Sequence, residues 1–163
     1  MVYTYDYPRP MLTVDVVLWR QGASGREVLL IERKYPPFAG RWALPGGFVE
    51  PEERLAHAAL RELREETGVA EIEIRQLAAF GAPGRDPRGW TVSVVFYGRL
   101  PQGETLEVVA GDDAADAAWW PWGEEGEGLP PLAFDHAKIL QTTHQRITEA
   151  ETQNLASLRG SVL

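Results

Sequence analysis

The chain has 163 residues, of which 44% are hydrophobic and 25% charged, and its formal net charge is −8. This length suits one domain, residues 1–163, with a substantial core. The absence of cysteine excludes disulfides and thiolate metal sites. The negative charge disfavours nonspecific nucleic-acid binding, no apolar run approaches the roughly 18 residues that span a membrane, and the first residues lack the features of a signal peptide. We therefore expect a cytoplasmic protein that binds neither nucleic acid nor membranes.

The first half of the chain is predicted to contain strands followed by one helix. Residues 3–7 alternate tyrosines with smaller or polar residues, which is typical of an edge strand. Residues 11–19 and 26–34 are rich in β-branched and apolar residues, and the glycine-containing segment between them predicts a hairpin. Residues 34–47 are expected to form a loop with a short extended piece, and residues 51–67 give the strongest helix prediction.

The second half of the chain is predicted to add three strands, at residues 71–80, 90–100 and 117–122. A second helix is expected from about residue 136 to residue 149, with Asp135 as its N-cap. Strands that come first, with two helices interleaved and late, indicate an α+β domain in which helices pack on a mixed sheet.

The helix predicted at residues 51–67 has clear start and stop signals. Pro51 suits the first helical position, and Gly68 suits the position that follows the last helical residue. Glu52 and Glu53 would then lie in the first turn, where the helix dipole favours acids. At about 100° per residue, one arc of this helix is apolar and is predicted to be buried: Leu55, Ala56, Ala59, Leu60 and Leu63.

Three glutamates, Glu62, Glu65 and Glu66, border this arc near the C-terminal end of the helix. Like charges at this spacing cost roughly 0.2–0.5 kcal/mol per pair, and acids at this end also oppose the helix dipole. One interpretation is a solvated acidic face braced by arginines. The other is a site for Mg²⁺, a hard cation that takes carboxylate oxygens and binds substrate phosphates. Gly46 and Gly47 precede the helix and allow close backbone approach, so a carbonyl there is another candidate ligand.

Residues 47–69 carry a resemblance to a known family. Gly, five residues, Glu, seven residues, Arg-Glu-Leu, one residue, Glu-Glu, one residue and Gly-Val match every fixed position of the Nudix box. The chain thus resembles the Nudix hydrolases, which cleave a nucleoside diphosphate linked to another group, X. The resemblance implies an α/β/α sandwich around a mixed sheet. It also implies that Glu62, Glu65, Glu66 and the carbonyl of Gly46 bind Mg²⁺, with Mn²⁺ as the alternative ion.

The resemblance also suggests roles for residues near this metal site. Glu53 and Arg61 pair in many relatives, which holds the preceding loop against the helix. The general base is a box glutamate, Glu62 or Glu66, in one interpretation. In several relatives the base lies instead on a loop outside the box, and the candidates here are then Asp112, Asp113 and Asp116. For each of these aspartates, a solvated loop residue is the competing interpretation, and we take Asp116 as the catalytic candidate outside the box.

The loop at residues 81–89 is the best clue to the identity of X. Pro83 lies at a distance from the box that resembles the marker of ADP-ribose pyrophosphatases. Arg85 and Arg88 offer planar donor groups suited to phosphate. A polar hairpin connection without a binding role is the competing interpretation of this loop.

The same resemblance sets the functional expectation. Arg33 and Arg41 flank the loop before the box and are, with Pro83, Arg85 and Arg88, the candidate contacts for substrate. We expect Mg²⁺-dependent cleavage of a small nucleotide-sugar, ADP-ribose, to AMP and ribose 5-phosphate. Hydrolysis of damaged nucleoside triphosphates and a non-catalytic domain that senses ADP-ribose are the two alternatives. Relatives that act on ADP-ribose are often dimers, which favours a homodimer here.

Overall fold

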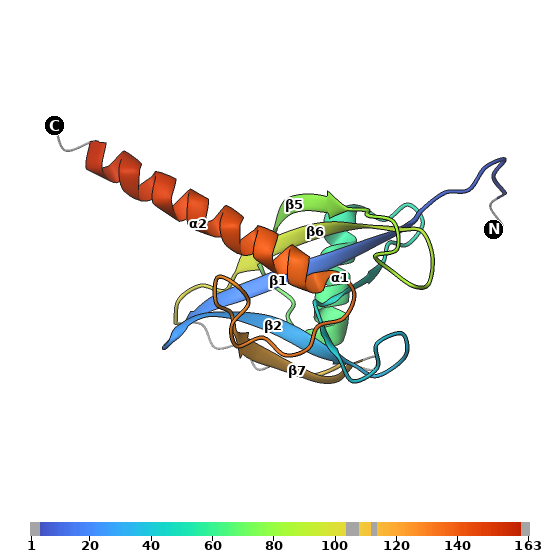
Figure 1. The fold of residues 1–163 in the computed structure, drawn as a ribbon, viewed down its shortest axis with the longest axis horizontal. Coiled ribbons are helices and arrows are strands. Elements are labelled where there is room, and N and C mark those ends of the chain that lie inside the picture. Colours follow the sequence, from blue (N-terminus) through green and yellow to red (C-terminus); the bar gives the residue numbers. More distant parts are fainter. Residues whose placement is uncertain (1–3, 104–107, 112–113, 161–163) are drawn as a thin grey trace.

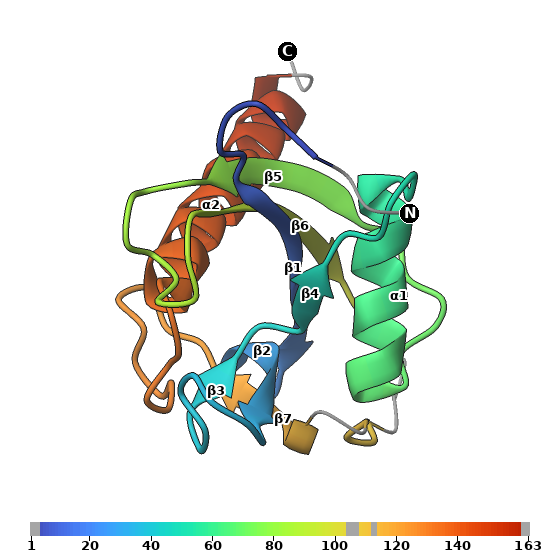
Figure 2. The same cartoon turned by 90° about the vertical axis from the view of Figure 1, so that its right-hand side faces the viewer.

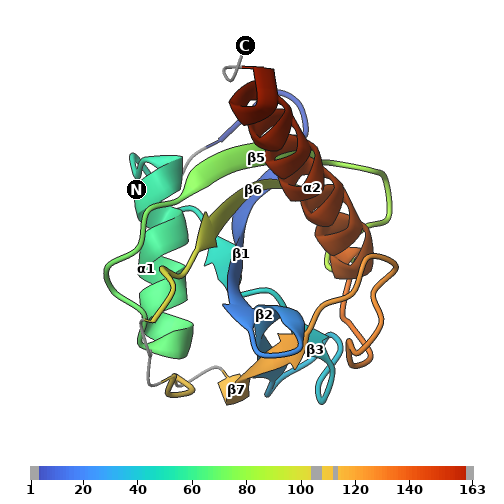
Figure 3. The ribbon, with the colours of Figure 1, turned by 90° about the vertical axis from the view of Figure 1, so that its left-hand side faces the viewer.

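The computed structural model describes residues 4–103, 108–111 and 114–160. The strands are β1 (Met11–Gly22), β2 (Gly25–Arg33), β3 (Trp42–Ala43), β4 (Gly46–Phe48), β5 (Arg75–Phe80), β6 (Thr91–Arg99) and β7 (Ala114–Pro121), and the helices are α1 (Leu55–Thr67) and α2 (His136–Gly160). The two helices lie on opposite sides of the sheet (Figures 2 and 3), and the C-terminal part of α2 projects beyond it (Figure 1). Within the described ranges, no helix combines the length and apolar composition needed to cross a membrane.

The sheet is mixed, as the sequence predicts. Its strand order is β3-β2-β1-β6-β5, with β4 added to β1 and β7 added to β2. β1 and β6 pair in parallel, whereas the other pairs are antiparallel. The predicted α+β class and the α/β/α arrangement are therefore confirmed.

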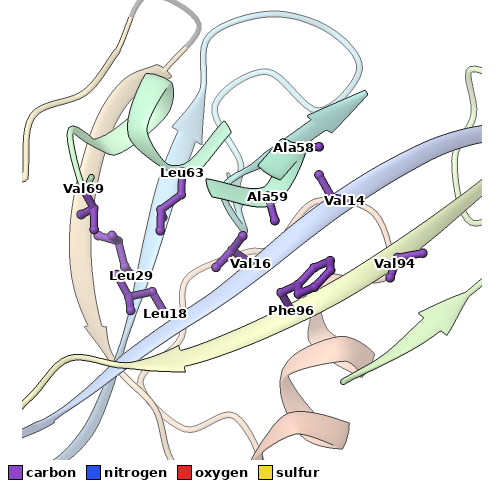
Figure 4. Packing of buried hydrophobic residues seen from close by; sticks show 10 residues of the cluster. All are labelled: Val14, Val16, Leu18, Leu29, Ala58, Ala59, Leu63, Val69, Val94 and Phe96. Atoms are coloured by element: carbon purple, nitrogen blue, oxygen red, sulfur yellow. The ribbon is translucent and has the colours of Figure 1, made fainter. Parts of the chain in front are cut away.

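Side chains of β1 alternate between two core layers because successive residues of a strand point to opposite faces. Val14, Val16 and Leu18 pack with residues of α1 in one buried cluster (Figure 4). Val17 and Trp19 belong to a second cluster, which contains buried residues of α2. β1 is thus covered on both faces, which explains its nearly continuous apolar sequence.

β1 also changes its antiparallel neighbour along its length. Residues 13–15 pair with β4, whereas residues 19–22 pair with β2. The sheet therefore opens between β4 and β2, and Figure 2 shows β4 lying toward α1 while β2 and β3 turn away. Groups from both faces of the sheet can meet at this opening, where the candidate site lies.

Helix α1 begins four residues later than the sequence predicts. Pro51 and Glu52 form a turn in which Glu52 has a φ of 64°, and Arg54 is the N-cap. The turn forms because the carboxylate of Glu53 accepts a hydrogen bond from the backbone N–H of Glu50 at 3.0 Å, which keeps the acid in the loop. The end of the helix is as predicted: Gly68 has a φ of 76° and donates its N–H to a carbonyl of the last turn.

The buried face of α1 is rotated relative to the predicted arc. Ala58, Ala59 and Leu63 are buried, whereas Ala56 is exposed. The rotation turns the side of the helix that carries Glu66 toward the sheet.

Other differences lie at the ends of elements. Residues 4–7 are not part of a strand, β5 begins only at Arg75, and α2 continues to Gly160 rather than ending near residue 149. Asp135 does precede α2, but its carboxylate binds Arg85 instead of capping the helix.

Candidate active site

Two glycines let β4 approach the carboxylates around it. A Cβ atom on Gly46 would lie 2.2 Å from the carbonyl oxygen of Val14 and 2.7 Å from Oδ1 of Asp15. A Cβ atom on Gly47 would lie 2.5 Å from the carboxylate of Glu62. All three distances are too short for a Cβ atom, so a side chain at Gly46 would clash with the backbone and one at Gly47 would displace the carboxylate of Glu62.

Glu66 is the most strongly perturbed acid of the site. Its Oε2 accepts a hydrogen bond from the backbone N–H of Gly46 at 2.9 Å. Burial raises the pKa of Glu66 to about 8, and the nearby charges of Glu62 and Asp15 act in the same direction although the Gly46 hydrogen bond opposes them. The rotation of α1 therefore places a carboxyl group where a negative charge is poorly solvated.

Glu62 lies beside it on the same helix. Burial also raises the pKa of Glu62, whereas the guanidinium of Arg61, which donates to Oε1 at 2.7 Å, opposes the shift. Glu62 and Glu66 both line a pocket of about 470 Å³. Because the pKa values of both acids are raised, a positive charge bound beside them in the pocket would stabilise their ionised forms.

Arg61 and Glu53 form the predicted brace between the loop and the helix. Nε and Nη2 of Arg61 donate to the two carboxylate oxygens of Glu53 at 2.8 and 2.9 Å, and Nη2 also donates to the carbonyl oxygen of Phe48 at 3.0 Å. The hydrogen bonds from Arg61 hold the pKa of Glu53 at about 2. The predicted pairing is confirmed, and it fixes β4 against α1.

Glu65 is placed differently from the other two box acids. Its half-exposed carboxylate faces Nη1 of Arg61 at 3.3 Å and is not part of the pocket lining. Within the described residues, no three acid or histidine side chains already converge as a metal cage. The donor set nevertheless fits a hard divalent cation, because Glu62, Glu66 and the backbone of Gly46 offer oxygens and the pKa values of both acids are raised by burial.

The pocket lining also contains cationic and aromatic side chains. Arg33 lies with its guanidinium carbon 4.9 Å from the centre of the Phe134 ring, and Arg88 lies 5.3 Å from the same ring. Burial, followed by the charge of Arg88, lowers the pKa of Arg33. Two guanidinium groups close enough to repel each other are suited to an anionic ligand between them.

The two arginines of the predicted specificity loop are both tied to carboxylates. Arg85 donates to Asp135 through Nε and Nη2 at 3.0 and 2.7 Å, and its side chain is only 5% exposed. Arg88 is paired with Asp86 at 2.7 Å. All four of these residues except Asp135 line the pocket. Arg85 thus anchors the loop to the start of α2, while Arg88 keeps one face toward the pocket.

Besides Glu65, three predicted residues lie outside the pocket lining. Pro83 is exposed, and Arg41 donates to the carbonyl oxygen of Leu132 at 3.3 Å. Asp116 is exposed on β7, where its carboxylate accepts the N–H of Ala117 at 2.7 Å. The geometry therefore gives no support to Asp116 as the base, while Asp112 and Asp113 lie outside the described residues.

The sequence reasoning missed Asp15, Phe134 and His136, all of which line the pocket. Asp15 is a buried acid inside an apolar strand, and that single charge in "TVDVVLW" was the available signal. His136 gave no such signal, because its spacing from the other histidines does not suit a metal site.

Comparisons with known proteins agree with this geometry. The NUDIX domain family matches residues 9–143. An ADP-ribose pyrophosphatase of Methanocaldococcus jannaschii is 41% identical over 135 residues, which cover 83% of this chain and 73% of that protein. An ADPR responsive transcriptional repressor, NtrR, of Acinetobacter baylyi is 35% identical over 144 residues, which cover 87% of this chain and 56% of the repressor.

A solved structure is similar over nearly the whole fold. The NUDIX domain of Shewanella oneidensis NrtR, crystallised with ADP ribose, superposes with a TM-score of 0.75 and 35% sequence identity. The match covers 88% of this chain and 94% of that domain. With a family match over most of its length, an intact box and the expected sandwich, the chain is a homologue of an ADP-ribose pyrophosphatase and belongs to the Nudix family.

Proposed function

We propose that the chain is a divalent-cation-dependent hydrolase that cleaves the diphosphate of ADP-ribose to AMP and ribose 5-phosphate. The observation that carries the proposal is the pocket itself, whose lining contains both the acids Glu62 and Glu66 and three arginines, Arg33, Arg85 and Arg88. A diphosphate has negative oxygens for the arginines and for a cation held by the acids. The 41% identity with an ADP-ribose pyrophosphatase supports this substrate.

In this proposal, Glu62, Glu66 and the carbonyl of Gly46 would hold Mg²⁺ or Mn²⁺, and Glu65 would contribute from the exposed side of α1. When bound, the cation supplies charge neutralisation and lowers the pKa of coordinated water. The brace between Arg61 and Glu53 keeps β4 and α1 at a fixed separation. The acids therefore need no rearrangement of the backbone to bind.

Water attacks one phosphorus atom of the diphosphate, and the bond from that phosphorus to the bridging oxygen breaks. The bridging oxygen leaves with the second phosphate. The proton lost by the water passes to Oε1 of Glu66, because Oε2 already accepts the Gly46 N–H. Arg33 and Arg88 hold the diphosphate between them, and Arg85 keeps the loop that carries Arg88 in place.

A substrate panel with Mg²⁺ and Mn²⁺, with products resolved by chromatography, tests the proposal. ADP-ribose should give AMP and ribose 5-phosphate at a higher kcat/KM than any nucleoside triphosphate in the panel, and EDTA should abolish turnover. Preferential release of pyrophosphate from a triphosphate would instead identify an enzyme that acts on damaged nucleotides.

The regulatory alternative has one specific observation in its favour, the 35% identity with the A. baylyi repressor. Binding of ADP-ribose without turnover at saturating Mg²⁺ would support that function. The same repressor is longer than this chain, which covers 56% of it. The intact set of box residues favours the enzyme.

A further inference from the structure

A buried polar group that the proposed chemistry does not use lies at the pocket. It consists of Asp15 on β1, Ser93 on β6 and His136, the first residue of α2, with relative exposures of 8%, 0% and 3%. Asp15 and His136 line the pocket, and Ser93 supports Asp15 from behind. Burying three polar side chains next to one another costs free energy unless each polar atom has a hydrogen-bond partner. The partners of each atom therefore show which atoms are left to bind a ligand.

The side chain of Asp15 is held in one orientation. The hydroxyl of Ser93 donates a short hydrogen bond to Oδ2, which leaves Oδ1 directed to the other side. Oδ1 lies 3.6 Å from Nε2 of His136, which exceeds the roughly 2.7–3.2 Å of a hydrogen bond between nitrogen and oxygen. In the described residues, no hydrogen bond uses Oδ1 of Asp15.

The proton of His136 is placed by the backbone of the neighbouring segment. The N–H of Leu44 donates to Nδ1 of His136 at 2.9 Å, so Nδ1 carries no proton and the proton of the neutral ring is on Nε2. Burial lowers the pKa of His136, which keeps the ring neutral. The pocket therefore presents a carboxylate acceptor and an N–H donor side by side, slightly too far apart to satisfy each other.

We propose that Asp15 and His136 bind a vicinal diol of a ribose ring in the diphosphate substrate. One hydroxyl donates to Oδ1 of Asp15, and its neighbour accepts the proton of Nε2 of His136. This inference deepens the proposed function, on which it rests, by assigning the sugar a binding pair outside the box.

The chemistry of the pair selects a diol over other ligands. A phosphate oxygen would be repelled by the carboxylate of Asp15, and a cation would be repelled by the N–H of His136. A hydroxyl is both donor and acceptor, so two adjacent hydroxyls satisfy both protein groups. A site built to hydrogen-bond a hydroxyl rejects analogues that lack it, because its own buried groups are then left without partners.

ADP-ribose contains two riboses, and three ligands distinguish them. ADP-ribose has both diols, the methyl ester of ADP lacks the terminal ribose, and 2′,3′-dideoxyadenosine diphosphoribose lacks the diol of the nucleoside. Binding is measured by isothermal titration calorimetry in EDTA, so that no hydrolysis takes place. The protein variants are wild type, Asp15→Asn and a matched control, Thr143→Val, which replaces a buried hydroxyl of α2 that bonds within its own helix.

Asp15→Asn should weaken ADP-ribose binding by up to about tenfold, as expected when a hydrogen bond to a charged acceptor becomes one to a neutral amide oxygen. Asp15→Asn should leave unchanged, or improve, the binding of the one ligand that lacks the recognised diol, because removing a negative charge favours an anion. The ribose whose diol is missing from that ligand is then the one that Asp15 and His136 bind. Thr143→Val should bind all three ligands like wild type.

Several outcomes would overturn the inference. They are equal weakening of all three ligands by Asp15→Asn, equal affinity of wild type for all three, and no binding of ADP-ribose by wild type. If Asp15→Asn does not fold, as judged by circular dichroism, Ser93→Ala takes its place. That variant frees Oδ2 and should reduce severalfold the preference for ligands that carry the recognised diol over the ligand that lacks it. If the preference is fully retained, Asp15 and His136 do not bind the diol as proposed. Binding without turnover after Mg²⁺ is added would contradict the proposed function but not the diol site.

Discussion

Replacing Glu66 by glutamine should change the pH dependence of stability in the cation-free protein. The pKa of Glu66 is raised from 4.5 to about 8, chiefly by burial. The folded chain thus binds this proton more tightly than the unfolded chain does. The resulting contribution to stability is fully present below about pH 4.5 and is lost as the pH rises through about 8. Glutamine does not ionise, and its side-chain oxygen can still accept the N–H of Gly46.

The magnitude follows from the size of the shift. The difference of about 3.5 pH units corresponds, at about 1.36 kcal/mol per unit, to at most about 5 kcal/mol. As the pH rises from 5 to 9, the free energy of unfolding of wild type should therefore fall relative to that of Glu66→Gln by up to this amount. Urea denaturation in EDTA across this range measures both curves. Added Mg²⁺ should then stabilise wild type more than Glu66→Gln, because only the wild type has both buried acids to bind it.

Glu65→Gln is the matched control, since it removes a half-exposed charge from the same helix. Its unfolding free energy should follow that of wild type within about 0.5 kcal/mol, as is usual for surface changes. Parallel curves for wild type and Glu66→Gln from pH 5 to 9 would refute the argument, because they would show that Glu66 is ionised in the folded protein without cost.

Three further changes test other parts of the site. Gly47→Ala should lower kcat at least tenfold with a folded protein, because a Cβ would displace the carboxylate of Glu62, and steady-state kinetics with circular dichroism check this. Arg85→Ala should lower the free energy of unfolding by about 1.5–3 kcal/mol in urea and also reduce the preference for ADP-ribose, since it breaks a buried pair that holds the loop. Asp116→Asn should leave kcat/KM within about twofold of wild type, and a loss of a hundredfold would restore Asp116 as the base.

The placement of Glu62 and Glu66 at the pocket could be predicted because it is encoded by local spacing. Helical periodicity places both acids on one side of α1, and Gly46 and Gly47 precede the helix by a short loop. Glu65 shows the limit of this reasoning, because its half-exposed carboxylate pairs with Arg61 and is not part of the pocket lining.

The substrate side of the pocket could not be predicted in the same way. Asp15 and His136 are 121 positions apart in the sequence and meet only because β1 changes its neighbour and α2 begins at the opening. Arg85 was correctly placed at the pocket, yet its bidentate partner Asp135 was predicted to cap α2. Both the approach of Asp15 to His136 and the ion pair between Arg85 and Asp135 join residues far apart in the sequence, so they depend on the strand order.

The start of α1 was missed for a related reason. The signals at Pro51 and Glu52 are those of a helix start, but Glu53 is held in the loop by Arg61, a residue two turns into the helix. A charge-assisted, bidentate bond outweighs the modest gain of an acid in the first turn.

The most direct test of the central claim is the fate of ADP-ribose, followed by ³¹P NMR, with wild type and Glu66→Gln in the presence of Mg²⁺. The account predicts that wild type replaces the diphosphate signals by two phosphate monoester signals, from AMP and ribose 5-phosphate. Glu66→Gln should be slower by orders of magnitude, and wild type with EDTA should be inactive. Intact ADP-ribose after prolonged incubation with wild type and Mg²⁺, or equal rates for the two proteins, would contradict the account.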